Sequence, residues 1–280
     1  MKGWRELPRL VKCAAVNWID DAAPSMGASL AFYTLFSIVP LLIVVISLAS
    51  PFVGDEAARQ ILIEQIATLA GDKAATGVTS LLDAAAAHEK GRFAGYIGPV
   101  LLLLAATTVF AELQSDMNRI WHYKPRSGGV LAFIRKRFVS FTLVMMVGLL
   151  LLASVAATAL LAWLGRKWFP HAAPLMRLAE FGISVVVITG LFAAIYKLLP
   201  SGRVDWRDVW VGAAVTSLLF WIGKLLIAVY ITHAAIASMY GAAGAIVVMI
   251  AWVYYSAQVF FFGAEFTRQV ALDRGTSAAP

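Results

Sequence analysis

An uncharged stretch of 23 residues, 28–50 (ASLAFYTLFSIVPLLIVVISLAS), most strongly limits what this chain can fold into. A helix needs about 20 apolar residues to cross the hydrocarbon core of a bilayer, so this stretch can span one. Five further apolar runs of 19 to 27 residues follow it. Because every backbone polar group must be satisfied within lipid, we expect each run to be helical. The sequence predicts an all-α polytopic membrane protein with six transmembrane helices, at about 26–50, 93–111, 138–164, 181–199, 208–230 and 242–264.

Few residues of this chain are charged, and most of its positive charges fall between the predicted spans. Of the 280 residues, 61% are hydrophobic and 14% charged, whereas soluble domains carry about 25% charged residues. The net charge of +7 is typical of membrane proteins whose cytoplasmic loops accumulate Lys and Arg. With the N-terminus inside, the predicted inner segments hold 15 Lys and Arg residues and the outer segments hold 7. We therefore expect both termini in the cytoplasm, and no nucleic-acid partner.

The chain divides into an amphipathic N-terminal segment, a six-helix domain and a short tail. Residues 1–25 are basic but lack the continuous apolar core of a secretion signal, so we expect them to be retained. Their apolar residues fall at helical spacing, which predicts a helix lying on the cytoplasmic membrane surface. The transmembrane domain is predicted over 26–265, and 266–280 as a cytoplasmic tail. In the first outer loop, 51–92, near-helical spacing after Asp55 and Glu56 predicts a cap of two short amphipathic helices.

Polar residues share one face of the first predicted span. Tyr33, Ser37 and Pro40 are four and three positions apart, which places them on the same side of a helix. Pro40 cannot donate to the carbonyl four residues earlier, so the helix is weakened there. The second and sixth spans carry similar faces. The residues expected to line a polar cavity between these three helices are Tyr33, Ser37, Pro40, Thr108, Glu112, Tyr254, Gln258 and Glu265.

Two interpretations of these faces stay open. In the first they meet in a polar cavity open to the cytoplasm, because ionisable groups near membrane depth usually face a pathway or a partner. In the second the hydroxyl and amide groups only bond neighbouring helices, each such bond contributing about 0.6 kcal/mol. Small residues four apart, such as Gly27 and Ala31, allow close helix approach and permit a homo-oligomer without requiring one.

Positive charges occur both inside a predicted span and in the largest inner loop. Lys224 is a candidate buried charge, although its stem can also reach the outer interface from about six residues within its helix. The inner loop is expected to contact anionic phospholipid headgroups, at about 1 kcal/mol per cation near the surface. The candidate contact residues are Lys124, Arg126, Arg135, Lys136 and Arg137.

The sequence lacks the patterns that would indicate a cofactor, a metal site or an enzyme. Cys13 is the only cysteine, and none of the four histidines lies within a helical turn of another. A metal-dependent ribonuclease needs a His and Asp cluster to hold metal and activate water. The chain also has no Walker A loop and no G-x-S-x-G elbow. We therefore expect no metal, no cofactor and no enzymatic activity.

Three segments of the chain together resemble a known family. They are ASLAFYTLFSIVPLLIVVISL, LQSDMNRIWHYKPR and GAAGAIVVMIAWVYYSAQVFFFGAEFTR, and the likeness extends over about residues 8–270. The chain is similar to the YihY/virulence factor BrkB family of bacterial inner-membrane proteins. This resemblance implies a six-helix protein of the inner membrane, with members linked to serum resistance and to the cell envelope. Members have also carried the label ribonuclease BN, which the scattered histidines do not support.

Three functional hypotheses follow. The first is a transporter or exporter of a small solute or envelope lipid, through the polar cavity between the first, second and sixth helices. The second is a membrane scaffold or partner-binding protein in envelope maintenance, which transports nothing. The third, which the missing metal-binding pattern disfavours, is a tRNA-processing ribonuclease.

Overall fold

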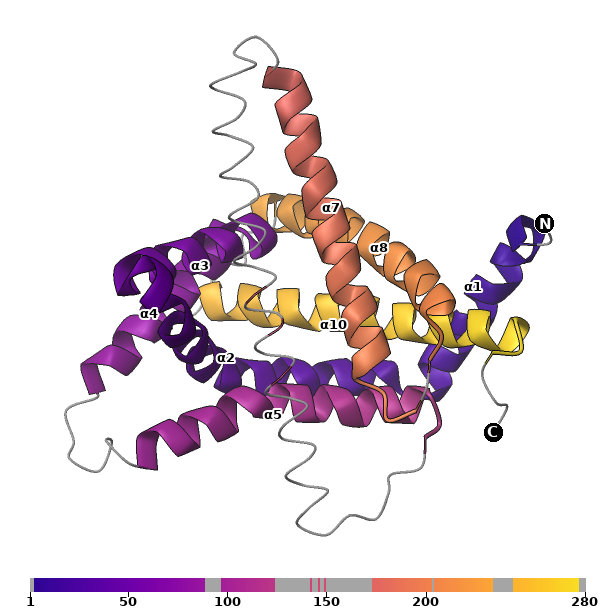
Figure 1. Ribbon diagram of the computed structural model, residues 1–280, viewed down its shortest axis with the longest axis horizontal. Helices are drawn as coiled ribbons and strands as arrows, with labels where there is room; N and C mark the ends of the chain where they lie inside the picture. The colour runs from indigo at the N-terminus through magenta and orange to yellow at the C-terminus, as the bar shows by residue number, and fades with distance from the viewer. Residues whose placement is uncertain are drawn as a thin grey trace.

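Every regular element that the computed structural model describes is an α-helix (Figure 1). The structure describes residues 3–88, 97–123, 142, 146, 149, 173–202, 204–233 and 244–276. The predicted all-α class is confirmed. Eight helices have their bounds within these residues: α1 (Gly3–Asp20), α2 (Ala23–Val53), α3 (Asp55–Ala70), α4 (Asp72–His88), α5 (Ile97–Ile120), α7 (Ala173–Leu198), α8 (Trp206–His233) and α10 (Gly244–Asp273).

Four of the described helices are long and apolar enough to cross a membrane. They contain the candidate spans Ala23–Val53, Phe181–Leu198, Trp206–Leu226 and Ile246–Asp273, which correspond to the first, fourth, fifth and sixth predicted spans. Large apolar side chains on these helices face outward, as lipid contact requires; Phe36 of α2, for example, is 63% exposed.

The second and third predicted spans are not among these four candidates. The second, 93–111, falls partly in α5, whose later turns carry Glu112, Asp116 and Arg119. The side chains of α5 are described only from Thr108 onward, which is too short a stretch to test this span. The third, 138–164, lies outside the described residues except for helical positions 142, 146 and 149. Four of the six predicted spans are therefore supported.

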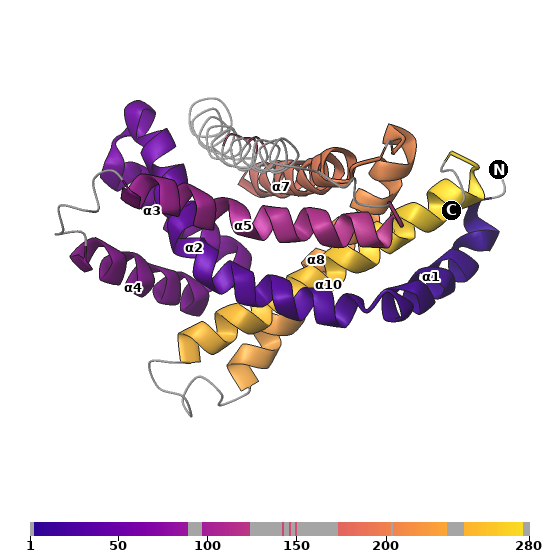
Figure 2. The ribbon, with the colours of Figure 1, turned by 90° about the horizontal axis from the view of Figure 1, so that it is seen from below.

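The start of α1 and the end of α10 lie at one end of the molecule, and α3 and α4 lie at the other (Figures 1 and 2). Helices α3 and α4 form where the sequence predicts a two-helix cap. Gly54 and Gly71 precede them with φ of 87° and 90°, a conformation that side chains disfavour. Arg59 of α3 pairs with Asp83 of α4, with Nη2 and Oδ1 2.5 Å apart.

Helix α1 packs against the last turns of α10 (Figure 2). Ala14 is buried against Phe266 and Val270, with Leu7 and Leu10 packed around this cluster. Because these α10 side chains are covered, α10 continues past the predicted end of the sixth span to Asp273. The apolar face of α1, which we expected on the membrane surface, is thus used in part against α10.

Helices α8 and α10 interlock through two reciprocal pairs of Gly and Thr. A Cβ built on Gly212 of α8 would lie 1.6 Å from Oγ1 of Thr267, and one on Gly263 of α10 would lie 1.7 Å from Oγ1 of Thr216. Each threonine donates its hydroxyl to the carbonyl of the glycine on its own helix, at 2.8 and 2.7 Å. The hydroxyl of the buried Tyr196 on α7 lies 2.8 Å from Thr216 Oγ1 and 2.7 Å from the carbonyl oxygen of Phe260. Small residues here bring the two backbones close, as in other membrane helix pairs.

Helices α2, α5 and α10 pack against one another pairwise, and α7 packs on α8. The first, second and sixth predicted spans, which carry the polar faces, therefore lie in or overlap three mutually contacting helices.

Replacing Gly263 by alanine is expected to destabilise the bundle by about 1–3 kcal/mol, because the new Cβ overlaps Thr216 and Tyr196. The matched control is Gly182→Ala on α7, where a Cβ meets no atom of the described residues within 4 Å. That change should be neutral or slightly stabilising, since alanine is the better helix former. Thermal unfolding of the purified proteins, followed by tryptophan fluorescence, measures both. Equal midpoints for the two variants would contradict the interlock.

Candidate functional site

The residues predicted to line a cavity lie on three mutually packed helices, with different degrees of burial. Ser37 on α2 is only 3% exposed, whereas Tyr33 and Pro40 are half-buried. On α5, Thr108 and Glu112 are half-buried. On α10, Tyr254 is 38% exposed, Gln258 is half-buried and Glu265 is fully buried. The structure therefore brings the three helices together and turns Tyr254 toward the outside.

Gln258 of α10 packs against Gly27 of α2. A Cβ on Gly27 would lie 2.0 Å from Gln258 Nε2, so a larger residue there would require this amide to move. Both the nitrogen and the oxygen of the amide are buried, and neither has a hydrogen-bond partner within the described residues. Buried amides in folded proteins are almost always bonded, so this pair of free atoms needs a partner of another kind.

Glu265 lies seven residues after Gln258, or two helical turns along the same face of α10. Its side chain is fully buried, and neither carboxyl oxygen has a hydrogen-bond partner among the residues described. The guanidinium of Arg268 lies 3.8 Å away, which is an ion pair but too long for a hydrogen bond. The carboxyl group of Asp21 faces it from the corner between α1 and α2. We call the Gln258 amide and the Glu265 carboxyl group the open polar groups.

His122 connects this end of α10 to α1 and α5. Its Nδ1 lies 2.9 Å from Arg268 Nη2, and its Nε2 lies 3.3 Å from Asp21 Oδ1. An arginine nitrogen can only donate, so Nδ1 is the acceptor and the ring proton sits on Nε2, where it points at Asp21. Asp21, His122, Arg268 and Glu265 thus form one chain of contacts, the inner-end network, across three segments.

The backbone is strained on both sides of the inner-end network. Ala22 and His122 have φ of 58° and 51°, and they are the two residues other than glycine with positive φ in the described ranges. The left-handed conformation costs a residue with a side chain about 1–2 kcal/mol. Such strain collects at functional sites, where surrounding contacts must hold it in place.

The end of α5 is held against the turn between α7 and α8. Gln114 Nε2 donates to the carbonyl of Leu199 at 3.2 Å, and Asn118 Oδ1 accepts from the backbone N–H of Ser201 at 2.8 Å. The ring of Tyr123 lies so close to Gly202 that a Cβ there would be 2.0 Å from Cζ. Partial burial raises the pKa of the Tyr123 hydroxyl, which stays neutral at physiological pH. These contacts fix the position from which His122 reaches Asp21 and Arg268.

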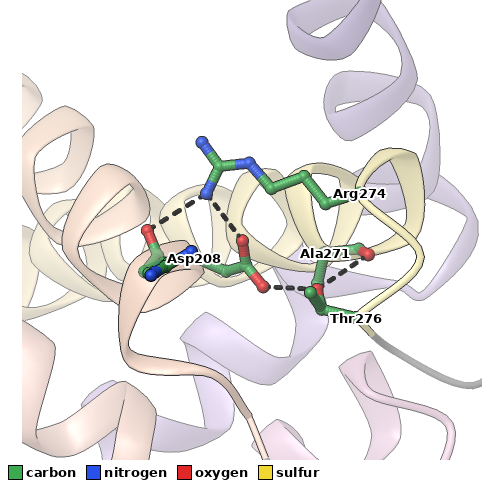
Figure 3. Close-up of polar contacts among 5 residues, drawn as sticks. Asp208, Ala271, Arg274 and Thr276 are labelled. Carbon is green, nitrogen blue, oxygen red and sulfur yellow. Dashed lines mark hydrogen bonds and ion pairs between the residues drawn. The ribbon is translucent and has the colours of Figure 1, made fainter.

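A second buried carboxylate, near the same end of the molecule, accepts a hydrogen bond at each of its two oxygens (Figure 3). Asp208, in the first turn of α8, is fully buried, and its Oδ1 accepts from Arg274 Nη1 at 2.8 Å. The hydroxyl of Thr276 donates to its Oδ2 and also lies 3.0 Å from the carbonyl oxygen of Ala271. The contacts of Asp208 close the end of α10 onto α8. By comparison, the equally buried Glu265 lacks donors among the described residues.

The remaining candidate residues lie away from this site or outside the described residues. Lys224 on α8 is half-buried, and its Nζ sits 5.0 Å from the ring centre of Trp221, a cation–π contact. The predicted lipid-contact residues Lys124, Arg126, Arg135, Lys136 and Arg137 lie outside the described residues.

Sequence reasoning selected Ser37, Gln258 and Glu265, whose polar atoms the structure places within the bundle, but did not select Asp21 or His122. Their signal was faint, because helical spacing relates residues within one helix and says nothing of contacts over a hundred positions. His122 stood out in sequence only as one of four scattered histidines. The structure gives it two partners, on α10 and at the end of α1.

The fold and the site define an α-helical membrane protein with ionisable groups buried among its helices. The chain belongs to the virulence factor BrkB family, whose model matches residues 14–280. This confirms the resemblance drawn from the three sequence segments. The two-helix cap and the α1 contact with α10 therefore lie wholly or largely within the family match.

Several curated relatives carry the name UPF0761 membrane protein. The relative from Pseudomonas aeruginosa (strain LESB58) is 28% identical over 260 residues, which cover 89% of this chain and 60% of that protein. The relative from Kangiella koreensis is 24% identical over 265 residues, covering 94% and 64%. That from Pseudoalteromonas translucida is 28% identical over 255 residues, covering 89% and 81%. The chain thus spans about three fifths of the length of the first of these relatives. No solved structure matches the chain.

Replacing Asp208 and Glu265 by their amides should show that the two buried carboxyl groups contribute differently to stability. Asp208→Asn removes the charge that Arg274 and Thr276 bond, and we expect it to cost about 2 kcal/mol of unfolding free energy. Glu265→Gln introduces a donor beside Asp21, so we expect a change below about 1 kcal/mol, or a gain. Thermal unfolding in detergent measures both. A larger loss for Glu265→Gln than for Asp208→Asn would show that Glu265 is a structural charge.

Proposed function

We propose that this protein is a membrane transporter that moves a small solute or envelope lipid along the contact between α2, α5 and α10. The observation that carries the proposal is the pair of open polar groups, two turns apart on one face of α10. A buried polar group left without a partner costs about 1–3 kcal/mol. A face that keeps two of them is suited to a partner that arrives and leaves, such as water or a transported molecule.

Asp208 and Tyr196 argue against a purely structural role for this face. Both are buried polar groups of the same bundle, and both are bonded by neighbouring helices. A scaffold would be expected to treat Gln258 and Glu265 in the same way, because stability is all that its polar groups serve. Other buried atoms of the described residues, such as Ser217 Oγ and Trp121 Nε1, also lack a partner. The feature that favours transport over the partner-binding scaffold is therefore the placement of an amide and a carboxyl group on one face of α10.

The tight seat of Gln258 against Gly27 corresponds in this proposal to a closed state. Transport then requires α2 to move away from α10. Pro40 assists such movement, because it leaves the carbonyl of Phe36 without its helical donor and weakens α2 a few turns beyond Gly27. The half of α2 before Pro40 carries Gly27, Tyr33 and Ser37, which would move as one piece.

We further propose that the protein lies in the bacterial inner membrane with both termini in the cytoplasm. The excess of Lys and Arg in the inner segments supports this orientation. So does the arrangement of the start of α1 and the end of α10 at one end of the molecule (Figure 1). The inner-end network would then close the cytoplasmic end of the path.

Thiol labelling from both sides of the membrane tests the proposal. Single cysteines replace Ser37 and Gln258 in a Cys13→Ser background, in right-side-out and inside-out vesicles. We expect a charged, membrane-impermeant maleimide to react with both positions from at least one side, since an opening path admits water.

Two further positions serve as controls. A cysteine at Phe36, next to Ser37 but 63% exposed on the outer surface of α2, should stay unreactive because it faces lipid. One at Glu64, exposed on α3, should react from one side only. If the cysteines at Ser37 and Gln258 label from neither side, yet react fully after denaturation, the scaffold hypothesis replaces transport.

A further inference from the structure

The contact between Asp21 and Glu265 carries one negative charge more than its surroundings balance. Within the described residues, the inner-end network holds two carboxyl groups and one permanent cation, Arg268. His122 adds no charge, because its Nδ1 accepts from Arg268 and only Nε2 carries a proton. A buried charge without a counter-charge is strongly unfavourable.

The same contact also lacks a hydrogen-bond donor. Asp21 Oδ1 accepts from His122, while Asp21 Oδ2 and both oxygens of Glu265 are buried without a partner in the described part of the chain. The carboxyl group of Asp21 nevertheless interacts with that of Glu265. Two carboxylates can bond only through a proton that one of them carries.

We propose that Asp21 and Glu265 share one exchangeable proton, and that its release detaches α1 and the corner before α2 from α10. One proton meets both needs, because it neutralises the surplus charge and supplies the missing donor. The role of this proton as the coupling ion of a transporter rests on the proposed function. The existence of the proton site at the carboxyl pair does not.

A metal cation fits the contact less well than a proton. The guanidinium of Arg268, 3.8 Å from Glu265, would repel it. Nor do three or more His, Cys, Asp or Glu side chains gather to hold a metal ion anywhere in the described residues. The groups that act on Glu265 are Asp21, at the corner between α1 and α2, and Arg268 of its own helix. His122, which follows α5, is bonded to both Asp21 and Arg268.

Proton release is transmitted through α1. Ala14 of α1 packs on Phe266, the residue next to Glu265, and on Val270, so repulsion at Asp21 acts beside this apolar contact. Gly27, which seats Gln258, lies five residues after the strained Ala22 at the same corner. Moving the corner would therefore loosen the α2 contact with α10 as well.

Hydrogen exchange across α1 tests the proposal without any substrate. The wild-type protein and the variants Glu265→Gln, Asp21→Asn and Asp20→Asn are compared in lipid nanodiscs by mass spectrometry, over about pH 5 to 9. Rates are corrected for the intrinsic effect of pH. In the wild type we expect residues 3–20 to become less protected as pH rises and the proton leaves.

The Glu265→Gln and Asp21→Asn variants should remove this response. The amide that either substitution introduces would donate permanently to the facing carboxylate and mimic the protonated pair, so exchange stays slow at high pH. At high pH we expect exchange in these variants to be at least about tenfold slower than in the wild type. Tenfold is the change that one pH unit produces in the protonation ratio of one titrating group. Asp20→Asn, which neutralises the adjacent exposed carboxylate, should follow the wild type.

Three outcomes would overturn the proposal. One is the same profile in Glu265→Gln and the wild type, and another is a flat profile in Asp20→Asn. The third is protection restored by Na⁺ at high pH, which would make a metal cation the ligand. Since none of these measurements labels Ser37 or Gln258, a failed transport test and a failed proton test remain distinct.

Discussion

A polar side chain inside a helix bundle in lipid has no bulk water to bond, so neighbouring helices must supply its partners. Tyr196, Thr216 and Asp208 obey this constraint through contacts among α7, α8 and α10. Several polar contacts of the bundle involve α10, which packs against α1, α2, α4, α5 and α8. How each polar group on α10 is satisfied therefore decides which neighbouring helices are fixed and which can move.

The two sides of α10 are built differently. Toward α8 it presents glycines opposite threonines, and threonine is branched at Cβ and stiff, so this contact cannot yield without losing its fit. Toward α2 it presents the end of a flexible glutamine, which can swing aside when Gly27 moves. The α8 side thus acts as a frame, also closed by Asp208 and Arg274, and the α2 and α1 side is the one suited to movement.

The features of this structure that the sequence predicts are those set by residues close together in the chain. Hydropathy identified α2, α7, α8 and α10 because lipid exposure is a property of each helix alone. Spacing by three and four selected Ser37, Gln258 and Glu265, since a shared face is also local. Partners are not local. The packing of Ala14 on Phe266 and the contacts of His122 join distant segments, and periodicity holds no information on them.

The same limit explains Tyr254 and the length of α10. Tyr254 is 38% exposed although it shares a face with Gln258, because spacing defines a face but not how much of it a neighbouring helix covers. Hydropathy ended the sixth span near its first charges, Glu265 and Arg268. Those charges are buried because α1 and His122 cover them, so α10 runs on to Asp273.

Strain and charge at the inner end act in opposite directions, and this makes a two-state element of the α1 corner. Ala22 and His122 in the left-handed region favour opening by about 1–2 kcal/mol each. The apolar contact of Ala14 and a balanced network favour closure. Adding or removing one charge in a buried network changes its energy by a similar amount, because low local polarity strengthens each interaction. A single protonation can therefore decide whether the corner between α1 and α2 is closed against α10 or open. A relaxed backbone, or a carboxylate with all its hydrogen bonds such as Asp208, would not respond in this way.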